Sequence, residues 1–370
     1  MRKKYLNELT IIITTYNRPK FLIRSIQYWK DKNIKIIYLD GSKKRIDLNI
    51  TNKLNSNIKY IHKPVSQYER ILSIIDIVET NYVMFGSDDE FYITSALNSC
   101  ITELKKDKDL VACGGVCHAF NFKKNKILGY FKYPKLISVN LNQKNADDRI
   151  KNHFYNYVPA HIYSVCKTST WKTISSGIFS KEYNFYSAFE FQIEFLFVYA
   201  GKSKVIPELM WLRSYENNPI RNVSPQLMIN NRIENWWYRK NSIYKHEYND
   251  FLTRMNDICQ NLDKSKKKKY QTTQKNIEIA FNGLMKLNKK INFFFSNYLF
   301  LNYFFIKIKK TKILIKFLSN LFNYLINKNM DNNEFDKQII YLSKNKIYID
   351  YKELNKIKLL INNFHKNKIN

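Results

Sequence analysis

The sequence predicts an α/β fold in which helices flank an open, mostly parallel sheet, followed by a helical C-terminal extension. Short apolar runs rich in β-branched residues alternate with segments of helical periodicity as far as Arg213, which is typical of repeated βαβ units. Acidic residues follow two of these runs directly, at Asp40 and at Asp88-Asp89. Beyond Arg213 the alternation is lost, and residues 226–290 are polar with helical patterning.

The first βαβ unit begins the pattern. Residues 9–15 are an apolar, β-branched run that ends at a turn-forming Tyr-Asn-Arg-Pro segment, so we expect a buried strand. Pro19 suits the first turn of a helix, and apolar residues recur at helical spacing to about Lys30. A second strand is expected over residues 34–39. This succession implies parallel strands joined by a right-handed crossover.

The alternation then repeats along the chain. We expect strands over residues 58–61, 82–85, 110–116 and 204–206, and helices over residues 67–78, 94–105 and 187–199. In an open parallel sheet, ligands bind at the carboxyl ends of the strands. Asp40, Asp88 and Asp89 all follow strands, so the sequence predicts a binding site at that edge.

Length and composition fit one large domain with a smaller second part. The chain has 370 residues, and its 45% hydrophobic content is enough for a sizeable core. We place the first domain at residues 1–225 and a basic helical region at residues 226–370. The five cysteines form no paired framework, which predicts free buried thiols. Cys113, Cys117 and His118 lack a second ligand pair, so core packing is favoured over a zinc site.

The net charge of +31 is the most unusual feature of the composition. A pI near 9.7 usually indicates nucleic acid or an anionic membrane as a partner. Lysine is spread over the whole chain, however, together with abundant Asn, Ile, Tyr and Phe, all of which AT-rich codons encode. Genome composition therefore explains much of the excess, and we predict no nucleic-acid partner. No amino-terminal signal peptide is visible, so we expect a cytoplasmic protein.

One C-terminal segment bears on membrane association. Residues 291–306 are rich in Phe, Tyr and Leu, but the run is interrupted by polar residues and is shorter than the roughly 20 apolar residues of a spanning helix. A lysine cluster and a second apolar stretch follow, up to residue 326. Two interpretations of residues 291–326 remain open: a peripheral helix on the inner face of an anionic membrane, and a helical hairpin buried against the first domain.

Asp88 and Asp89 are adjacent carboxylates at the end of a buried strand. Burial and mutual repulsion make such a pair costly unless a positive group shares the site. A divalent cation is the natural partner, since carboxylate and phosphate oxygens suit Mg²⁺ or Mn²⁺. The alternative is an Asp-Asp turn or helix cap, which is common in any sequence.

Three segments of the predicted sheet carry distinctive motifs. Residues 9–19 read LTIIITTYNRP, residues 38–42 read YLDGS, and residues 82–90 read YVMFGSDDE. In this order they resemble the opening strand and turn, the second strand and the metal-binding strand end of family 2 glycosyltransferases. The resemblance implies a GT-A fold, which is a Rossmann-like α/β sheet. It also implies a nucleotide-binding half at about residues 7–120 and an acceptor half at about residues 121–215.

The resemblance assigns roles to five side chains. Thr14 and Tyr16 match the loop that lies against the nucleoside, and Asp40 matches the acidic residue that contacts the base. Asp88 is similar to the carboxylate near the ribose and the metal, and Asp89 matches the principal metal ligand. The implied donor is a nucleotide sugar, with a UDP-sugar expected, and the implied cofactor is Mg²⁺ or Mn²⁺.

An inverting transfer also needs a base that removes a proton from the acceptor hydroxyl. Family members often carry a Glu-Asp pair at the start of a helix after the metal site, and the matching position here is Glu190. We predict that Glu190 is the base, with Glu194 one helical turn later as the fallback. The alternative for Glu190 is a charge at a helix amino terminus that the macrodipole favours. Aromatic residues that fit the acceptor side are Tyr155, Tyr157, His161 and Trp171, although core packing is the alternative for each.

The predicted function is a metal-dependent inverting glycosyltransferase. The acceptor is expected to be a glycan or a lipid-linked molecule, and bacterial surface polysaccharide assembly is the expected setting by resemblance. Gly86 and Phe191 stand where many family members have Asp. These departures keep a second interpretation open, in which the chain is a catalytically inactive scaffold in a membrane assembly complex. A basic nucleic-acid-binding protein is the third interpretation.

Overall fold

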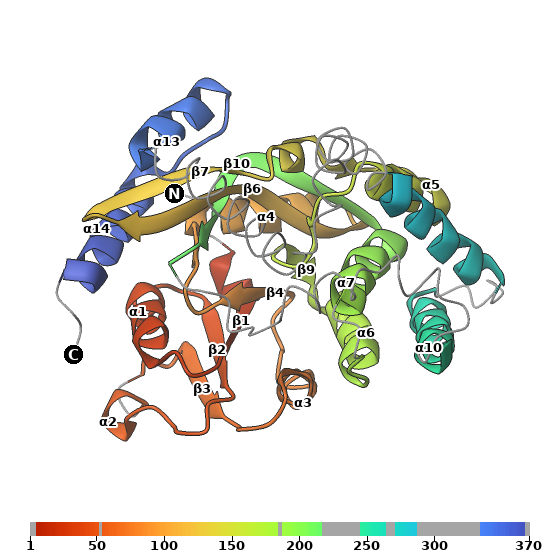
Figure 1. Cartoon of the computed structure of the whole chain (residues 1–370), viewed down its shortest axis with the longest axis horizontal. Coiled ribbons are helices and arrows are strands. Elements are labelled where there is room, and N and C mark those ends of the chain that lie inside the picture. Colours follow the sequence, from red (N-terminus) through yellow and green to blue (C-terminus); the bar gives the residue numbers. More distant parts are fainter. Residues whose placement is uncertain are drawn as a thin grey trace, which may run out of the picture.

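The computed structural model describes residues 5–51, 54–183, 187–216, 245–263, 271–286 and 334–366. Its centre is a single sheet of ten strands (Figure 1). Eight strands follow the order β3-β2-β1-β4-β9-β6-β10-β5, while β7 pairs with β6 and β8 pairs with β10. The order is that of an open sheet with crossovers, which confirms the predicted α/β class.

The first part of the sheet is parallel, as the sequence predicts. Its strands are β1 (Leu9–Thr15), β2 (Lys35–Asp40), β3 (Ile58–His62) and β4 (Tyr82–Ser87). The connections contain the 3-10 turn η1 (Leu6–Glu8) and the helices α1 (Pro19–Trp29), α2 (Leu48–Thr51) and α3 (Gln67–Leu72). The prediction of a helix over residues 67–78 was too long, since α3 ends at Leu72 and turns follow it.

The second part of the sheet mixes parallel and antiparallel pairs, and the sequence predicted only its strands over residues 110–116 and 204–206. It comprises β5 (Phe91–Tyr92), β6 (Leu110–Lys123), β7 (Lys126–Lys132), β8 (Asn140–Leu141), β9 (Val165–Lys167) and β10 (Lys202–Ser214). The β6–β7 hairpin turns through Lys124 and Asn125, both at positive φ. That geometry matches a two-residue hairpin turn, but Lys-Asn lacks the glycine that usually signals one in sequence.

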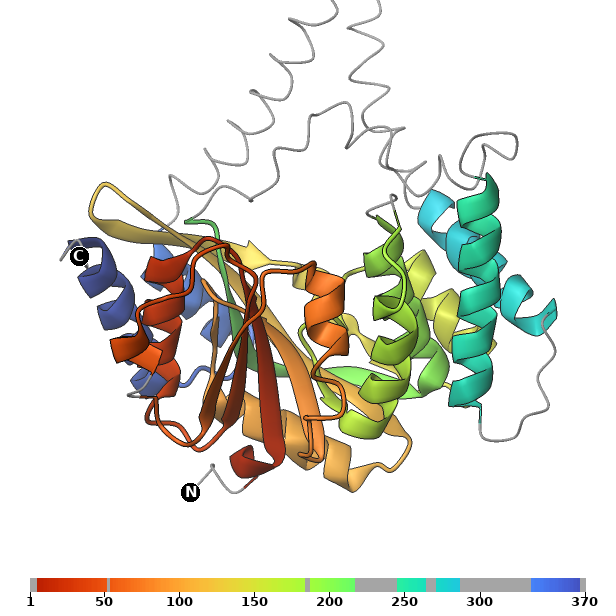
Figure 2. The ribbon, with the colours of Figure 1, turned by 90° about the horizontal axis from the view of Figure 1, so that it is seen from below.

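Helices cover the sheet in two groups. The helix α4 (Thr94–Lys106) packs on β6 and β10. The helices α5 (Ala146–Tyr155), α6 (Thr168–Phe179), α7 (Ser187–Ala200) and α10 (Lys245–Leu262) pack on one another beyond β9, as Figure 2 shows. The 3-10 turn η2 (Pro134–Ser138) lies against β6, and residues 271–286 are also helical.

Two C-terminal helices pack on the β7 side of the sheet. The helices α13 (Phe335–Lys344) and α14 (Tyr351–Lys366) pack on β7, and α14 also contacts α1 (Figure 1). Glu353 of α14 accepts hydrogen bonds from the Thr94 amide at 2.8 Å and from the Tyr28 hydroxyl at 3.0 Å, and it pairs with Lys32. Helix α14 is therefore joined to α1 and to the start of α4 by buried polar contacts.

The described part of the chain contains no helix that is long and apolar enough to cross a membrane. The segment 291–326, for which a membrane helix and a buried hairpin both remained open, lies outside the described residues. All five cysteines are buried and free, as the sequence predicts.

Candidate active site

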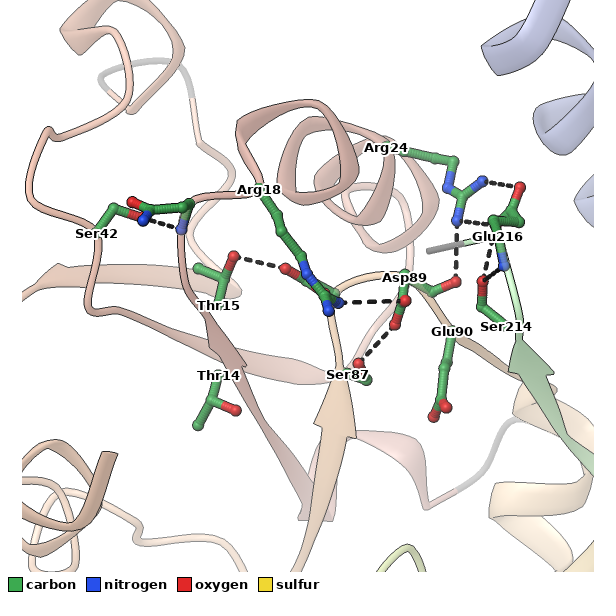
Figure 3. Close-up of polar contacts among 12 residues, drawn as sticks. Thr14, Thr15, Arg18, Arg24, Ser42, Ser87, Asp89, Glu90, Ser214 and Glu216 are labelled. Carbon is green, nitrogen blue, oxygen red and sulfur yellow. Dashed lines mark hydrogen bonds and ion pairs between the residues drawn. The ribbon is translucent and has the colours of Figure 1, made fainter. Parts of the chain in front are cut away.

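The carboxyl ends of β1, β2 and β4 meet at one edge of the sheet and form the candidate site (Figure 3). The parallel register puts Thr15 opposite Asp40 and Thr14 opposite Ser87. Asp88 follows β4 directly, so it lies beside the end of β1. The acids that follow strands in the sequence are thus brought to one edge.

Asp88 and Asp89 share one cationic side chain. The Nη1 atom of Arg18 lies 3.2 Å from Asp88 Oδ1 and 3.3 Å from Asp89 Oδ2. The Thr15 hydroxyl donates to Asp88 Oδ2 at 2.6 Å, and the Ser87 hydroxyl donates to Asp89 Oδ1 at 2.7 Å. Burial and, after it, the Asp89 charge raise the pKa of Asp88 to about 7. Burial and the neighbouring carboxylate therefore disfavour the ionised form of Asp88.

Asp40 is held in place by its neighbours. The Tyr60 hydroxyl donates to Asp40 Oδ2 at 2.6 Å, and the Ser42 amide donates to Oδ1 at 2.8 Å. The Ser42 hydroxyl accepts from the Asn17 amide at 2.8 Å, which ties the turn after β1 to the turn after β2. Asp40 is 1% exposed, so its carboxylate is a fixed acceptor inside the site.

Arg70 spans the same two strand ends, and the sequence analysis missed it. Its Nη1 donates to the carbonyl oxygens of Thr15 at 3.0 Å and Leu39 at 3.3 Å. An added Cβ at Gly41 would lie 1.8 Å from this nitrogen, so any side chain at position 41 would displace the guanidinium. Gly41 directly after the strand was the only signal in the sequence.

A small cavity opens beside the acid pair. It has a volume of about 190 Å³, and its walls include Thr14, Tyr16, Arg18, Arg70 and Asp88. Larger hollows of about 690 and 910 Å³ have none of these residues in their walls. We locate the site by its convergent charged and polar groups rather than by cavity size.

A buried ion pair supports the backbone of Asp89. Arg24 is fully buried and donates from Nη2 to the Asp89 carbonyl oxygen at 2.9 Å (Figure 3). The same guanidinium pairs with Glu216 through contacts of 2.9 and 2.6 Å. His365 Nε2 of α14 lies 2.5 Å from Glu216 Oε1. Burial raises the pKa of Glu216, but Arg24 and His365 outweigh it and hold that pKa below its ordinary value.

Glu190 lies in the first turn of α7, and it is exposed. The Tyr157 hydroxyl donates to Glu190 Oε1 at 2.5 Å. Burial raises the pKa of Tyr133, and the charge of Glu190 contributes to that rise. Tyr133 in turn contacts Arg213 at the end of β10. Glu190 is therefore an accessible carboxylate that faces a group of aromatic side chains.

Comparison with known proteins identifies the domain that carries this edge of the sheet. The sequence profile described as glycosyl transferase family 2 matches residues 10–164. Residues 10–164 are a family 2 glycosyltransferase domain. The match contains residues 10–19 of the first motif and all of the other two, and it supports the predicted family for this part of the chain. No curated protein matches the chain.

Solved structures that match the chain include S. aureus TarS. The longer TarS structure matches at 12% identity and a TM-score of 0.41, over 75% of this chain and 54% of that chain. TarS residues 1–349 match at 11% identity and a TM-score of 0.42, over 77% of this chain and 91% of that chain. The same fragment in complex with UDP-GlcNAc matches over the same shares at 12% identity and a TM-score of 0.42. This chain spans about half of the longer TarS chain.

The structure explains why the family 2 domain has glycine at position 86. An added Cβ at Gly86 would lie 3.1 Å from Ile11, 3.2 Å from Ile13 and 3.3 Å from Tyr92. These contacts are tight and mostly apolar, so an Asp side chain at this position would meet the core. The packing around the end of β4 therefore explains why position 86 does not carry a third acid.

Phe191 is likewise a core residue. It is 3% exposed and stacks on Phe281 at 4.7 Å and on Phe195 at 5.7 Å. A carboxylate at position 191 would be buried among aromatic rings without a partner. Glu190 is the adjacent acid of α7 that faces outward.

Glu194 lies one turn after Glu190 but is fully buried. It accepts from the His161 amide at 2.9 Å and the Ala160 amide at 3.2 Å, and Oε2 lies 2.7 Å from His161 Nδ1. His153 Nε2 is 3.0 Å from the same oxygen. Burial raises the pKa of Glu194, yet the two imidazoles outweigh it and hold that pKa far below its ordinary value.

The surroundings of Glu194 therefore fit a structural carboxylate better than a base for an acceptor. His161, expected as either an acceptor contact or a core residue, is 2% exposed, and its Nε2 lies 2.8 Å from the Ser203 hydroxyl. Trp171 is 1% exposed and belongs to the core. Tyr157 is the member of the expected acceptor group that contacts Glu190.

Two places in the described part of the chain have side chains that could hold a divalent ion. His153, His161 and Glu194 form the one cluster of three His, Cys, Asp or Glu side chains, among those the structure describes, whose ligand atoms lie within 4.8 Å. The Glu194 carboxylate of this cluster already accepts from two backbone amides and contacts both imidazoles. The Asp88–Asp89 pair fits the ion better, because its two carboxylates lie together around Arg18 and Asp88 lines a cavity. Cys113, Cys117 and His118 form no such cluster within the described ranges.

Proposed function

We propose that this chain is a metal-dependent inverting glycosyltransferase that moves a sugar from a UDP-sugar to a glycan or lipid-linked acceptor. The observation that carries the proposal is the buried Asp88–Asp89 pair beside a cavity that Thr14 and Tyr16 line. The pair supplies carboxylate oxygens for Mg²⁺ or Mn²⁺ at the point where parallel strands end. Bacterial surface polysaccharide assembly is the proposed setting.

The donor occupies the edge formed by β1, β2 and β4 in this proposal. Asp40 is a fixed acceptor for N–H groups of the base, and Thr14 and Tyr16 lie along the nucleoside. Asp89 and Asp88 hold the cation, which when bound neutralises negative charge on the departing diphosphate. Arg24 keeps the Asp89 backbone in position through its carbonyl oxygen.

Glu190 accepts the proton of the acceptor hydroxyl in the transfer step. As that proton leaves, the acceptor oxygen forms a bond to the anomeric carbon, and the bond from that carbon to the diphosphate oxygen breaks. Attack opposite the leaving group inverts the configuration at the carbon. The exposed position of Glu190 and its hydrogen bond from Tyr157 support this role, because they leave a carboxylate oriented and accessible.

The inactive-scaffold interpretation rests on Gly86 and Phe191. Both residues have a packing reason for their identity, so neither departure by itself indicates a lost activity. We favour the enzyme for that reason. We also propose a division at residue 225 between the catalytic domain and the basic C-terminal region, and a peripheral location on the inner face of the membrane.

The experiment is a screen of the purified protein against a panel of nucleotide sugars with Mn²⁺ or Mg²⁺, measuring thermal shift and sugar release. The proposal predicts a response to one nucleotide class that requires the metal. Glu190→Gln should retain binding but lose transfer, whereas the exposed control Glu182→Gln should behave like the wild type. Absence of a response to every nucleotide would contradict the proposal.

A further inference from the structure

Arg18 occupies the position between the two acids where a cation is expected. Its Nη1 atom contacts both Asp88 and Asp89, at 3.2 and 3.3 Å. The side chain of Arg18 is 19% exposed, compared with 2% for Asp88 and 10% for Asp89. The guanidinium thus covers the acids from the side of the cavity, which it also lines.

The contacts of Arg18 with the two acids are long for ion pairs. Hydrogen bonds from a cationic nitrogen to a carboxylate are usually about 2.7–2.9 Å long, and the strongest arginine pairs are bidentate. Arg18 reaches both carboxylates through one nitrogen, at 3.2 and 3.3 Å. Arg18 is therefore a partner that the acid pair can exchange.

The backbone position of Arg18 also permits movement of its side chain. Arg18 is the residue immediately before α1, and its dihedral angles are non-helical. Its carbonyl oxygen accepts from the Leu22 amide at 3.0 Å, but its side chain makes no hydrogen bond that caps the helix. Asp88, Thr15 and Ser87 belong to or directly follow strands of the sheet. The acids and hydroxyls are fixed by the sheet, while the guanidinium is held mainly by charge.

We propose that Arg18 is an exchangeable counter-ion. It neutralises Asp88 and Asp89 in the empty enzyme, a divalent cation displaces it, and the released guanidinium then pairs with the diphosphate of the donor. The inference rests on the proposed function and adds a residue to it. Two positive groups held against the same two carboxylates repel each other, so Arg18 and the metal compete for the acids. A diphosphate next to the metal offers the guanidinium a bidentate partner in exchange.

The competition predicts opposite effects of one substitution on two ligands. Without nucleotide, Arg18→Gln should bind Mn²⁺ about tenfold more tightly than the wild type, because the competing charge is gone. With saturating Mn²⁺, the same variant should bind UDP about tenfold more weakly, because a charged hydrogen-bond donor to the diphosphate is lost. A residue that only maintained the shape of the site would weaken both ligands.

The experiment measures free Mn²⁺ by electron paramagnetic resonance and UDP binding by calorimetry on four proteins. These are the wild type, Arg18→Gln, Asp89→Asn and Lys20→Gln. Lys20 is an exposed cation two residues away, so Lys20→Gln controls for the change in net charge and should match the wild type on both ligands. Asp89→Asn should lose Mn²⁺ binding, and circular dichroism checks that every variant is folded.

The outcomes separate the role of Arg18 from the proposed function. Tighter Mn²⁺ binding together with weaker UDP binding in Arg18→Gln supports the exchange. Unchanged or weaker Mn²⁺ binding in Arg18→Gln overturns the exchange. If Asp89→Asn loses Mn²⁺ binding in the same experiment, the metal site of the proposed function is still supported. If no protein binds Mn²⁺, the exchange and the metal dependence both fail. If Arg18→Gln does not fold, Arg18→Lys replaces it. That variant should also bind Mn²⁺ more tightly and UDP more weakly than the wild type, with smaller changes in both affinities.

Discussion

The sheet edge around Asp88 and the interior around Glu194 each hold a buried carboxylate, but the two regions neutralise it differently. Asp88 depends on Arg18, whose contacts are long and partly exposed, and its pKa rises to about 7. Glu194 has two backbone amides and two imidazoles around it; burial raises its pKa, but these imidazoles outweigh that effect and lower it.

We call the sheet edge around Asp88 and Asp89 the open region and the buried cluster around Glu194 the closed region. Three elements meet at Glu194: α5 through His153, the segment before β9 through His161, and α7. At Asp88 the compensation is incomplete, and a cavity adjoins it. Incomplete compensation next to a cavity is what a ligand can exploit.

The largest expected effect comes from breaking the closed region. Glu194→Gln should destabilise the fold by about 3–5 kcal/mol, because it removes one partner of a buried charged cluster. Denaturant unfolding measures the change. The matched control is Glu190→Gln on the same helix, which should leave stability nearly unchanged because Glu190 is exposed. Equal stability of the two variants would show that Glu194 is not a structural centre.

The open region should respond in the opposite manner. Asp89→Asn should lower turnover about 100-fold or more, because the diphosphate loses a metal ligand, and it should leave stability unchanged or slightly raised. The stability gain follows from removing one of two repelling charges. Steady-state kinetics and thermal melting test both parts, with the exposed Asp76→Asn as the control. A variant that unfolds while the wild type remains stable would contradict the assignment.

His161→Gln sharpens the comparison within the closed region. His161 supplies a ring contact to Glu194 at 2.7 Å, and its other nitrogen lies 2.8 Å from Ser203. Loss of the imidazole should cost about 1.5–3 kcal/mol, which is the usual range for a hydrogen bond to a charged group. Turnover at a temperature where the variant is folded should stay near the wild type. A large loss of turnover there would mean that His161 contacts substrate.

His118 provides a third case, because it is a buried titratable group whose ring nitrogens have no hydrogen-bond partner among the described residues. Burial lowers the pKa of His118 to about 3 from an ordinary value near 6.5. The folded state therefore binds fewer protons than the unfolded state between these values. Stability should be fully present above about pH 6.5 and fall by up to about 1.4 kcal/mol per pH unit as the pH decreases towards 3.

The matched variant for this prediction is His118→Leu. It removes the titrating ring from the contact with Phe335, whose ring centroid lies 5.0 Å away. Denaturant unfolding at pH 7 and pH 5 should show a smaller loss of stability at pH 5 for the variant than for the wild type. Equal losses would mean that His118 is protonated in the folded state.

The open region was predictable from sequence because its parts are contiguous. Each motif contains both a strand and the residues that follow it, so the strand pattern itself brings Asp40 and Asp88 to one edge. Arg18 stood inside the first motif, but nothing in the sequence indicated that it contacts both acids. Arg70 was missed because its target is the backbone of two strands, which leaves only a glycine as a trace.

The remaining parts depend on contacts between distant residues. Arg24 and Glu216 are 192 positions apart, and His365 comes from a third segment. The pattern around Glu194 correctly predicted a helix, but α7 is apolar on nearly every side, so periodicity did not distinguish Glu190 from Glu194. Tertiary packing decided which of the two acids is exposed.

The most direct measurement is a crystal structure of the protein soaked with UDP and Mn²⁺, with anomalous scattering used to locate the ion. We predict one strong anomalous peak within coordination distance of Asp89 and no peak at Glu194. The side chain of Arg18 should be turned from the acids towards the diphosphate. A peak between His153, His161 and Glu194 with none at Asp89, or a diphosphate bound at another edge of the sheet, would contradict the prediction.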